Sequence, residues 1–392
     1  MSEFDTLFYR DSYCREFTSR VKSCQPYRKN YAVELEETAF YPEGGGQPGD
    51  TGTLNGKPVS DTRKIEGRIM HVLSESMEEG TEVHGVLDWE NRLDHMVMHS
   101  AEHMVSGLIH KTFGYDNVGF HMGEDAVIID FNGPMDWNAC MKIEAMANAL
   151  VRRNLTIRAD IPGEEELRDM DYRSKKELSG EVRIVTVPEA DVCACCGTHL
   201  RSTGEIGYIK LISLANHKNG VRIEMLAGKR AEEYMRMIMD QNMRISHLLS
   251  AKMNETAAAA EKLQNSYYET RQKLRIASEA AMRQSIAAMK DNEPLVVAFA
   301  ENADHDALRY FANAIIEEKG ALTAAALCED DGAIRYVIVS HASALRPLIK
   351  DLNKQLKGRG GGSDELVQGM FACKRSEAEA ALYEVLGAKE SA

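Results

Sequence analysis

Long hydrophobic runs are missing from this chain of 392 residues. No apolar stretch approaches the ~18 residues that a membrane-spanning helix requires, and the first residues lack the basic start and apolar stretch of a signal peptide. Basic residues are also outnumbered, 47 against 61 acidic ones, for a net charge of -14. We therefore expect a cytoplasmic protein with no membrane partner. This charge argues against a protein coated in nucleic acid, although not against one local basic surface.

Cysteine is scarce as well. The chain has eight cysteines, and three of them crowd together as Cys193, Cys195 and Cys196. So few cysteines are typical of a reducing compartment, and their crowding favours a metal or catalytic cluster over a disulfide framework.

The length predicts more than one domain, and the patterning divides the chain into four stretches of an α+β protein. Residues 1–90 show short alternating runs separated by turn residues, including the dipeptide Asn55-Gly56, and predict a small antiparallel β-barrel. Residues 91–228 begin with a strong helix, continue with mixed helix and strand, including a strand near residues 204–213, and predict an α+β domain with the metal site.

The second half of the chain is different. Residues 229–291 contain neither proline nor glycine, and they predict a long helix or helical hairpin with a corner near residues 254–256. Residues 292–392 alternate strand-like runs with amphipathic helices and predict a compact C-terminal α/β domain.

The helix predicted for residues 92–114 carries two stripes. One stripe is apolar and the opposite one is rich in histidine; their members are Leu93, Val97, Ala101, Met104 and Leu108, and His95, His99, His103 and His110. Histidines four apart on a helix can chelate one ion, although the glutamate that follows the first histidine in metalloproteases is missing here. We interpret His99 and His103 as ligands, with a polar solvent-facing stripe as the alternative. His95 and His110 are expected to be packed or solvated.

A second element, DVCACCGTHL, supplies Cys195 and His199. Thiolate and imidazole are the donors that zinc prefers, so the two pairs predict a tetrahedral set of His99, His103, Cys195 and His199. The spacing leaves open that Cys193 or Cys196 replaces Cys195. A cysteine nucleophile with His199 as its base is another reading, but four donors in two pairs favour metal binding.

Three motifs carry a family resemblance. HSAEH (99–103), CCGTH (195–199) and FYPEGGGQPGDTG (40–52) resemble the editing domain of alanyl-tRNA synthetases and of the free-standing AlaX proteins, over about the first 230 residues. The helical segment and GRGGGSDELVQG (358–369) resemble the DHH-associated domain at the synthetase's C-terminus. An ATP-binding aminoacylation domain is not expected before the barrel.

The resemblance implies a long-form AlaX protein that hydrolyses mischarged tRNA(Ala) in trans, with serine or glycine as the wrong amino acid. It also implies one zinc ion on His99, His103, Cys195 and His199. The motif CCGTH departs from the usual CGGTH at Cys196, whose thiol can compete for metal or oxidise with Cys195. The alternative function is a non-catalytic, zinc-stabilised tRNA-binding or synthetase-associated module. A DHH-type phosphoesterase is disfavoured because no Asp-His-His sequence is found.

The resemblance further implies the pocket around the metal. Thr38 matches a threonine that family members place there and is expected to recognise serine, with an edge-strand threonine as the alternative. Gly44, Gly45 and Gly46 are expected to form a wall of the pocket, with Gln47 as a polar group at its rim. The catalytic set then comprises Thr38, Gln47, His99, His103 and Cys195. His121 and Arg222 are expected to bind substrate, with positions on a strand surface as the alternative.

A tRNA partner requires local basic surfaces on an acidic chain. Three clusters are candidates: Arg20, Lys22, Arg28 and Lys29; Arg173, Lys175, Lys176 and Arg183; and Lys350, Lys354, Lys357 and Arg359. The C-terminal domain is expected to hold the tRNA body outside its acceptor end. The helical segment is then either a spacer or an interface of a homodimer, for which the C-terminal domain is the other candidate.

Overall fold

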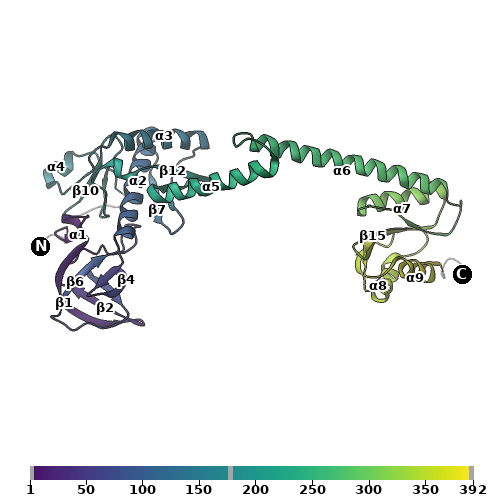
Figure 1. The fold of residues 1–392 in the computed structure, drawn as a ribbon, viewed down its shortest axis with the longest axis horizontal. Helices are drawn as coiled ribbons and strands as arrows, with labels where there is room; N and C mark the ends of the chain where they lie inside the picture. The colour runs from purple at the N-terminus through teal and green to yellow at the C-terminus, as the bar shows by residue number, and fades with distance from the viewer. Residues whose placement is uncertain (1–3, 175–179, 388–392) are drawn as a thin grey trace. The chain divides into compact units, whose positions relative to one another are not determined.

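The structure, a computed structural model, describes residues 4–174 and 180–387. The chain forms two compact units, one ending at Gln241 and the other beginning at Asn242 (Figure 1). Within the described residues, no helix combines the length and the apolar character needed to cross a membrane.

The first part of the chain is the predicted antiparallel barrel. After the short helix α1 (Leu7–Arg10), six strands close in the order β1-β2-β5-β4-β3-β6, and all their pairings are antiparallel. Their bounds are β1 (Glu16–Tyr27), β2 (Asn30–Leu35), β3 (Gly52–Leu54), β4 (Lys57–Ile65), β5 (Arg68–Leu73) and β6 (Glu82–Leu87). The β3–β4 hairpin turns at Asn55 and Gly56, both with positive φ, which is the geometry that this dipeptide favours.

The barrel is followed by α2 (Trp89–Phe113), which begins at the side-chain cap Asp88 and ends at the left-handed Gly114. Both predicted stripes of this helix are largely buried, because sheets lie around it rather than solvent. The sheets are β12-β13-β8-β7 and β11-β10-β9. The elements are β7 (Asn117–Met122), β8 (Val127–Phe131), α3 (Trp137–Arg153), β9 (Arg158–Asp160), α4 (Glu164–Asp169), β10 (Ile184–Val187), β11 (Asp191–Ala194), η1 (Thr203–Ile206), β12 (Ile209–His217) and β13 (Gly220–Ala227).

One strand begins later than predicted. Residues 203–206 form a 3-10 turn instead of continuing the strand, because Ser202 and Glu205 make a reciprocal capping box. Strand β12 therefore starts at Ile209.

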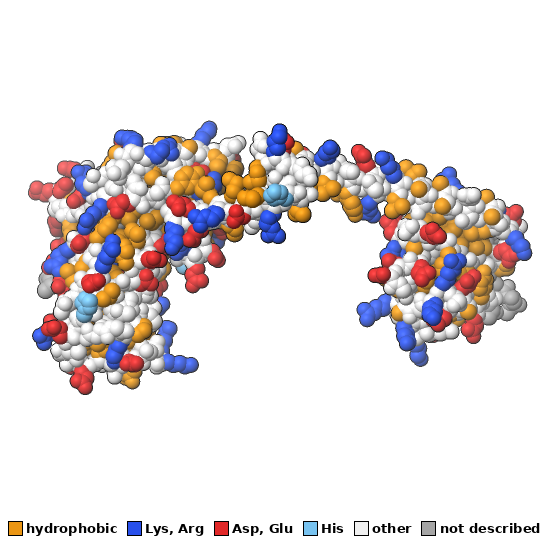
Figure 2. All heavy atoms as spheres, in the orientation of Figure 1, with side chains coloured by type: hydrophobic (Ala, Val, Ile, Leu, Met, Phe, Trp, Pro, Cys, Tyr) orange, Lys and Arg blue, Asp and Glu red, His pale blue; other side chains and the backbone are white. Residues whose placement is uncertain are grey.

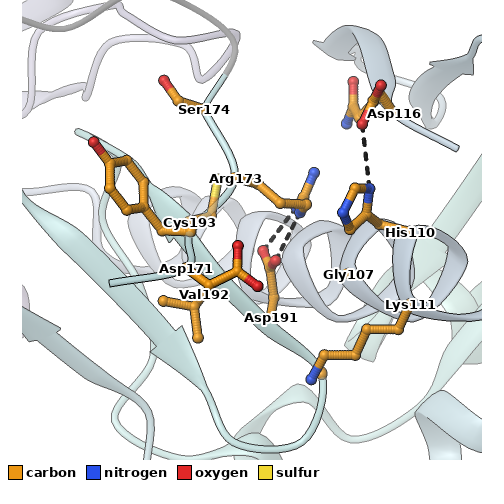
Figure 3. A pocket seen from close by; sticks show the side chains of 13 residues that line it. Gly107, His110, Lys111, Asp116, Asp171, Arg173, Ser174, Asp191, Val192 and Cys193 are labelled. Carbon is orange, nitrogen blue, oxygen red and sulfur yellow. Dashed lines mark hydrogen bonds and ion pairs between the residues drawn. The ribbon is translucent and has the colours of Figure 1, made fainter. Parts of the chain in front are cut away.

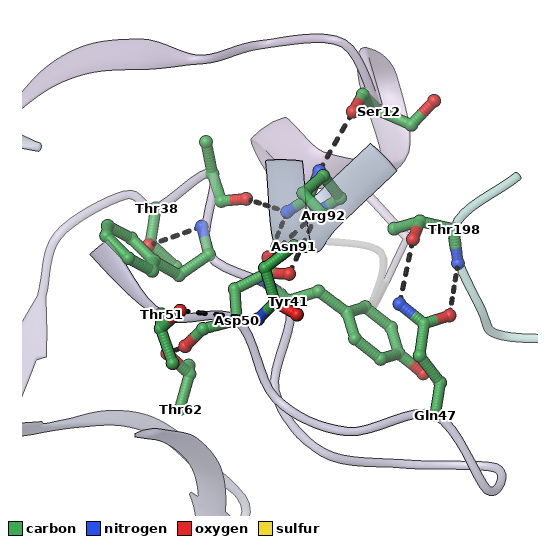
Figure 4. A network of polar contacts seen from close by, with 12 residues as sticks. Ser12, Thr38, Tyr41, Gln47, Asp50, Thr51, Thr62, Asn91, Arg92 and Thr198 are labelled. Atoms are coloured by element: carbon green, nitrogen blue, oxygen red, sulfur yellow. Dashed lines mark hydrogen bonds and ion pairs between the residues drawn. The ribbon is translucent and has the colours of Figure 1, made fainter. Parts of the chain in front are cut away.

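A buried ion pair joins the barrel to α2 (Figure 4). Arg92, fully buried, donates from Nε to both carboxylate oxygens of Asp50, at 3.0 and 2.9 Å. Its Nη1 donates to the carbonyl of Ser12 at 2.9 Å, and Asp50 accepts the backbone N–H of Tyr41. The end of the glycine-rich stretch is thereby anchored to the helix that carries the histidines.

The glycine- and proline-free segment forms two helices, α5 (Gly228–Leu249) and α6 (Thr256–Ala287), and the break between them contains the predicted corner. The C-terminal part is a five-stranded sheet in the order β14-β15-β16-β18-β17, in which β14 and β15 are parallel. Two hydrophobic clusters form, one with α6 and α7 and the other with α8 and α9. The elements are β14 (Leu295–Phe299), α7 (His305–Lys319), β15 (Thr323–Asp330), β16 (Ala333–Ser340), α8 (Leu345–Gln355), β17 (Arg359–Gly362), β18 (Leu366–Phe371) and α9 (Arg375–Gly387).

Candidate metal centre

The structure brings the four predicted donors together. His99 and His103 lie one turn apart on α2, and Cys195 and His199 lie in the loop after β11. The ligand atoms of all four lie within 4.8 Å of one another. The Sγ of Cys195 is 3.5 Å from Nε2 of His99 and 3.3 Å from Nε2 of His199. Three imidazoles and one thiol at this spacing could hold one metal ion.

The charges in the cluster suit a cation. Burial opposes ionisation of Cys195, but the three neighbouring histidines together lower the pKa of its thiol well below the usual range. Burial lowers the pKa of His199 to about 3, so its imidazole is neutral. A thiolate and a neutral imidazole are the protonation states that metal ligation requires.

Two ligands are oriented through their second ring nitrogen. Nδ1 of His99 lies 2.9 Å from Oε1 of Gln47, and Nδ1 of His103 lies 2.8 Å from Oδ2 of Asp191. Such bonds determine which nitrogen carries the proton and which faces the metal. The predicted rim position of Gln47 is wrong: its side chain is fully buried, and its amide also bonds Thr198 through both ends (Figure 4).

Asp191 and Arg173 form a support behind His103 that the sequence reasoning missed (Figure 3). Arg173 donates from Nε and Nη2 to the two oxygens of Asp191, each at 2.7 Å. Burial would raise the pKa of Asp191, but Arg173 and His103 lower it to about 2. The available signal was the position of Asp191 four residues before Cys195, at the start of the strand that leads to this cysteine.

The two alternative cysteines occupy different places. Cys193 is buried and belongs to a second donor group with His103 and Asp191. Cys196 is exposed, and its carbonyl accepts a hydrogen bond from the hydroxyl of Tyr9 at 2.9 Å. In the four-donor group found among the described residues, Cys195 supplies the thiol that lies beside His99 and His199.

Gly197 is required by the packing of His99. A Cβ at this position would lie 2.1 Å from Cε1 and 2.3 Å from Nδ1 of His99, which is far inside van der Waals contact. Gly197 therefore permits the loop to approach the histidine that it surrounds.

We expect Gly197→Ala to displace His99 and to reduce bound metal severalfold without unfolding the protein. Metal per chain, measured by elemental analysis after purification, checks this. Gly163→Ala is the matched control, because no described atom lies within 4 Å of a Cβ there. Equal metal content in the two variants would contradict the expectation.

The glycine stretch makes a tight turn beside the cluster. Gly44 and Gln47 pair with each other, and Gly45 and Gly46 have φ of 60° and 88°. A Cβ on Gly46 would collide with Phe120, whose ring stacks on His99 with 5.2 Å between centroids. Gly45 borders a cavity of about 260 Å³, which we call the reaction cavity.

The reaction cavity is lined by His99, His103 and Cys195, and also by Glu102. Glu102 is a second residue that the sequence reasoning missed. Its carboxylate is buried and accepts hydrogen bonds from Ser106 and Asn117. The signal was present in HSAEH, one residue before the second histidine.

Thr38 is not among the residues that line the reaction cavity. It is buried, its hydroxyl is 2.8 Å from Nε2 of His71, and it accepts the N–H of Phe40. Nδ1 of His71 lies 2.9 Å from the carbonyl of Val33, so this nitrogen donates and Nε2 accepts from Thr38. The hydroxyl proton of Thr38 is therefore donated to His71 of the barrel.

The buried His71 predicts a pH effect. Burial lowers its pKa to about 4, so the folded state favours neutral His71. Its contribution to stability is complete above pH ~6.5 and is lost as pH falls toward 4, by up to ~3 kcal/mol at ~1.4 kcal/mol per unit. Urea unfolding of wild type and His71→Gln over this range measures the difference. His84→Gln, at an exposed histidine, is the control, and parallel profiles for wild type and His71→Gln would contradict the assignment.

The two predicted substrate-binding residues lie elsewhere. His121 is exposed and borders a separate cavity of about 390 Å³ beside the glycine stretch. Arg222 lies on β13 and makes a bidentate ion pair with Asp130, at 2.7 and 2.8 Å. Neither lines the reaction cavity. Of the uninvolved histidines, His95 is buried and His110 pairs with Asp116.

The second basic cluster is not a surface cluster in the described residues. Arg173 is paired with Asp191, and Arg183 is buried and donates to the carbonyls of Cys195 and Gly197. Lys175 and Lys176 lie outside the described residues. In the first cluster, Arg20 and Lys22 pair with Glu82 and Glu34.

Comparison with known protein families points to tRNA synthetases. Residues 182–224 match the family model described as "Threonyl and Alanyl tRNA synthetase second additional domain", and residues 12–91 match "tRNA synthetases class II (A)". Two separate parts of the chain are therefore similar to families described for tRNA synthetases.

Relatives matched over nearly their whole length point to a narrower family. The chain is 29% identical to "Alanyl-tRNA editing protein AlaX-L" of Pyrococcus horikoshii over 95% of this chain and 96% of that protein. It is 26% identical to "Alanyl-tRNA editing protein Aarsd1" of Mus musculus, over 98% and 99%. "Alanine--tRNA ligase" of Ignicoccus hospitalis is 37% identical over 59% of this chain but only 27% of the ligase. The resemblance to the long-form AlaX proteins is confirmed.

Proposed function

We propose that this chain is a trans-editing deacylase that hydrolyses the ester of mischarged tRNA(Ala), with Ser-tRNA(Ala) as substrate and Gly-tRNA(Ala) as a second one. The observation that carries the proposal is the buried group of three imidazoles and one thiol that opens on the reaction cavity. Relatives named as alanyl-tRNA editing proteins, matched over nearly the whole chain, support it.

The donor set fits zinc. His99, His103, Cys195 and His199 would hold one ion, since nitrogen and thiolate ligands in a set of four are what Zn²⁺ prefers. When bound, zinc supplies a Lewis acid that can polarise a carbonyl or lower the pKa of water. The residues of the chain supply the orientation around it.

The ligands are not equally restrained. His99 and His103 are held through their second nitrogens by Gln47 and Asp191, whereas the buried Nδ1 of His199 has no hydrogen-bond partner among the described residues. Catalytic zinc sites keep one position open. We therefore propose that His199 would be the least restrained of the four residues that would hold the ion.

The other residues have proposed roles by position. Gly45 is proposed to form part of one wall, and Glu102, which lines the same cavity, is proposed to accept a proton. Thr38 is proposed to recognise the serine hydroxyl through the lone pair that His71 and Phe40 leave unused. Roles of His121 and Arg222 in substrate binding are proposed only for parts of the tRNA outside the reaction cavity.

We propose that residues 1–90 and 91–228 perform the editing, that 229–291 act as a linker, and that 292–392 form a DHH-associated domain that holds tRNA. The linker exposes large hydrophobic side chains, among them Leu263, Tyr267 and Leu274 of α6 (Figure 2). This exposure supports a homodimer interface on the helical segment, which sedimentation of the full chain would test.

The deciding experiment is deacylation of Ser-tRNA(Ala), Gly-tRNA(Ala) and Ala-tRNA(Ala) by purified protein, with and without a chelator. We expect Ser-tRNA(Ala) to be hydrolysed and Ala-tRNA(Ala) to be spared, because a site built to bond a hydroxyl leaves that polar group unpaired with alanine. Glycine lacks the hydroxyl too, so the rate for Gly-tRNA(Ala) decides separately whether it is a second substrate. Hydrolysis no faster than in buffer would leave the tRNA-binding module as the function. Equal rates for all three would reject the specificity.

A further inference from the structure

Three cavities meet at the glycine stretch. Gly45 borders the reaction cavity, the cavity of about 390 Å³ beside His121, and a third cavity of about 610 Å³. The third cavity, which we call the aromatic cavity, shares both Gly45 and Cys196 with the reaction cavity. The two cavities are therefore adjacent at these two residues.

Aromatic rings form one wall of the aromatic cavity. Phe8 and Tyr41 are 2% exposed and pack edge to face, with 5.6 Å between ring centroids. The hydroxyl of Tyr41 donates to the carbonyl of Gly44 at 3.1 Å, and that of Tyr9 donates to the carbonyl of Cys196 at 2.9 Å. The two tyrosine hydroxyls thus bond the glycine stretch and the loop at Cys196, the two segments shared with the reaction cavity. These bonds hold the aromatic wall in place.

The β4–β5 hairpin also contributes to the lining of the aromatic cavity. It supplies the exposed Lys64, the turn residue Gly67 and the half-buried Ile69. Glu43 also borders the cavity, but its carboxylate is paired with Arg63 at 3.2 Å. Aromatic rings with a nearby cation are the combination that binds single-stranded nucleic acid, by stacking on bases and attracting phosphate.

The neighbouring cavity of about 390 Å³ is less suited to this ligand. Two carboxylates, Glu43 and Asp61, line it, and both pair with the same Arg63. The aromatic cavity also has the size of ligand sites, which span ~300–1,000 Å³.

We propose that the aromatic cavity binds the nucleotides that precede the terminal adenosine of the unpaired acceptor end, while the aminoacylated adenosine occupies the reaction cavity. This inference rests on the proposed function and adds a second subsite to it. Tyr9 and Lys64 are its binding residues: Tyr9 supplies a ring beside Cys196, which both cavities share, and Lys64 supplies the charge.

The test compares two small esters, seryl-adenosine and the seryl ester of the trinucleotide CCA. For the wild type we expect a KM about tenfold lower for the trinucleotide, since stacking contributes ~1–3 kcal/mol per base. Lys64→Glu and Tyr9→Leu should remove most of this advantage with kcat little changed. Tyr9→Phe retains the ring and should retain the advantage, and Lys57→Glu, on the same strand β4 but outside the cavity, is the charge control.

Equal KM values for the two esters in the wild type, or equal increases for both in the variants, would overturn the subsite. Zinc content is measured in every variant, so damage to the metal centre through Cys196 is recognised. If the wild type hydrolyses neither ester, deacylation of Ser-tRNA(Ala) decides the proposed function separately, and a binding titration with uncharged CCA decides the inference. Binding that Lys64→Glu weakens supports it; no binding, or equal binding by both proteins, overturns it.

Discussion

Cys195→Ala is expected to release zinc and to reduce deacylation of Ser-tRNA(Ala) to the rate in buffer. Cys195 is the one thiol among the four donors, and its Sγ lies within 3.5 Å of nitrogens from two of the others. Its removal takes away the anionic ligand and leaves three imidazoles around the ion. Loss of a residue that merely orients a ligand costs ~10–100-fold in metal affinity, so loss of the thiolate itself should cost more.

Zinc per chain and initial deacylation rates measure this prediction. Cys193→Ala is the matched control from the adjoining strand β11, because Cys193 lies outside the four-donor group. His110→Ala tests the helix in the same way, since His110 pairs with Asp116 instead. Undiminished zinc in Cys195→Ala, or zinc lost only in Cys193→Ala, would contradict the ligand set.

Arg92→Ala is expected to lower the free energy of unfolding by ~3–5 kcal/mol, the cost of leaving a buried charge without its partner. Both side chains are almost completely buried, at 0% and 1% exposure, and Asp50 would keep its carboxylate with no cation beside it. The same substitution also removes the bonds from Arg92 to the carbonyls of Ser12 and Ala39. The barrel and α2 would lose this buried polar connection.

Urea unfolding at neutral pH measures the effect. Arg63→Ala is the control: Arg63 pairs with Asp61 and Glu43 at a partly exposed site, where ion pairs contribute ~0–1 kcal/mol. The double change Arg92→Met with Asp50→Leu should recover much of the lost stability, because it removes both charges together. Equal losses in Arg92→Ala and Arg63→Ala would show that the buried pair is not a main connection.

Local patterns were sufficient for several elements. The Asn55-Gly56 turn, the strands on either side of it and the break between α5 and α6 follow from residues adjacent in the chain. The proximity of His99 and His103 follows from helical geometry alone. The local pattern was wrong in one case: it predicted a strand from about residue 204, but the capping box makes residues 203–206 a 3-10 turn.

The surroundings of the cluster depend on residues far apart in the chain. Asp191 meets His103 across 88 positions, and Gln47 meets His99 across 52, so no local period indicates either contact. The same holds for Arg173, counted with a basic surface in the sequence and found in a buried pair.

Residue types and short spacings are local properties, and by themselves they determined the barrel, the histidine helix and the set of four donors to consider. Burial is a property of the packed molecule. Packing alone decided that Gln47 is an interior support and not a rim group, that Thr38 bonds His71, and that Gly197 must lack a side chain because His99 lies against it.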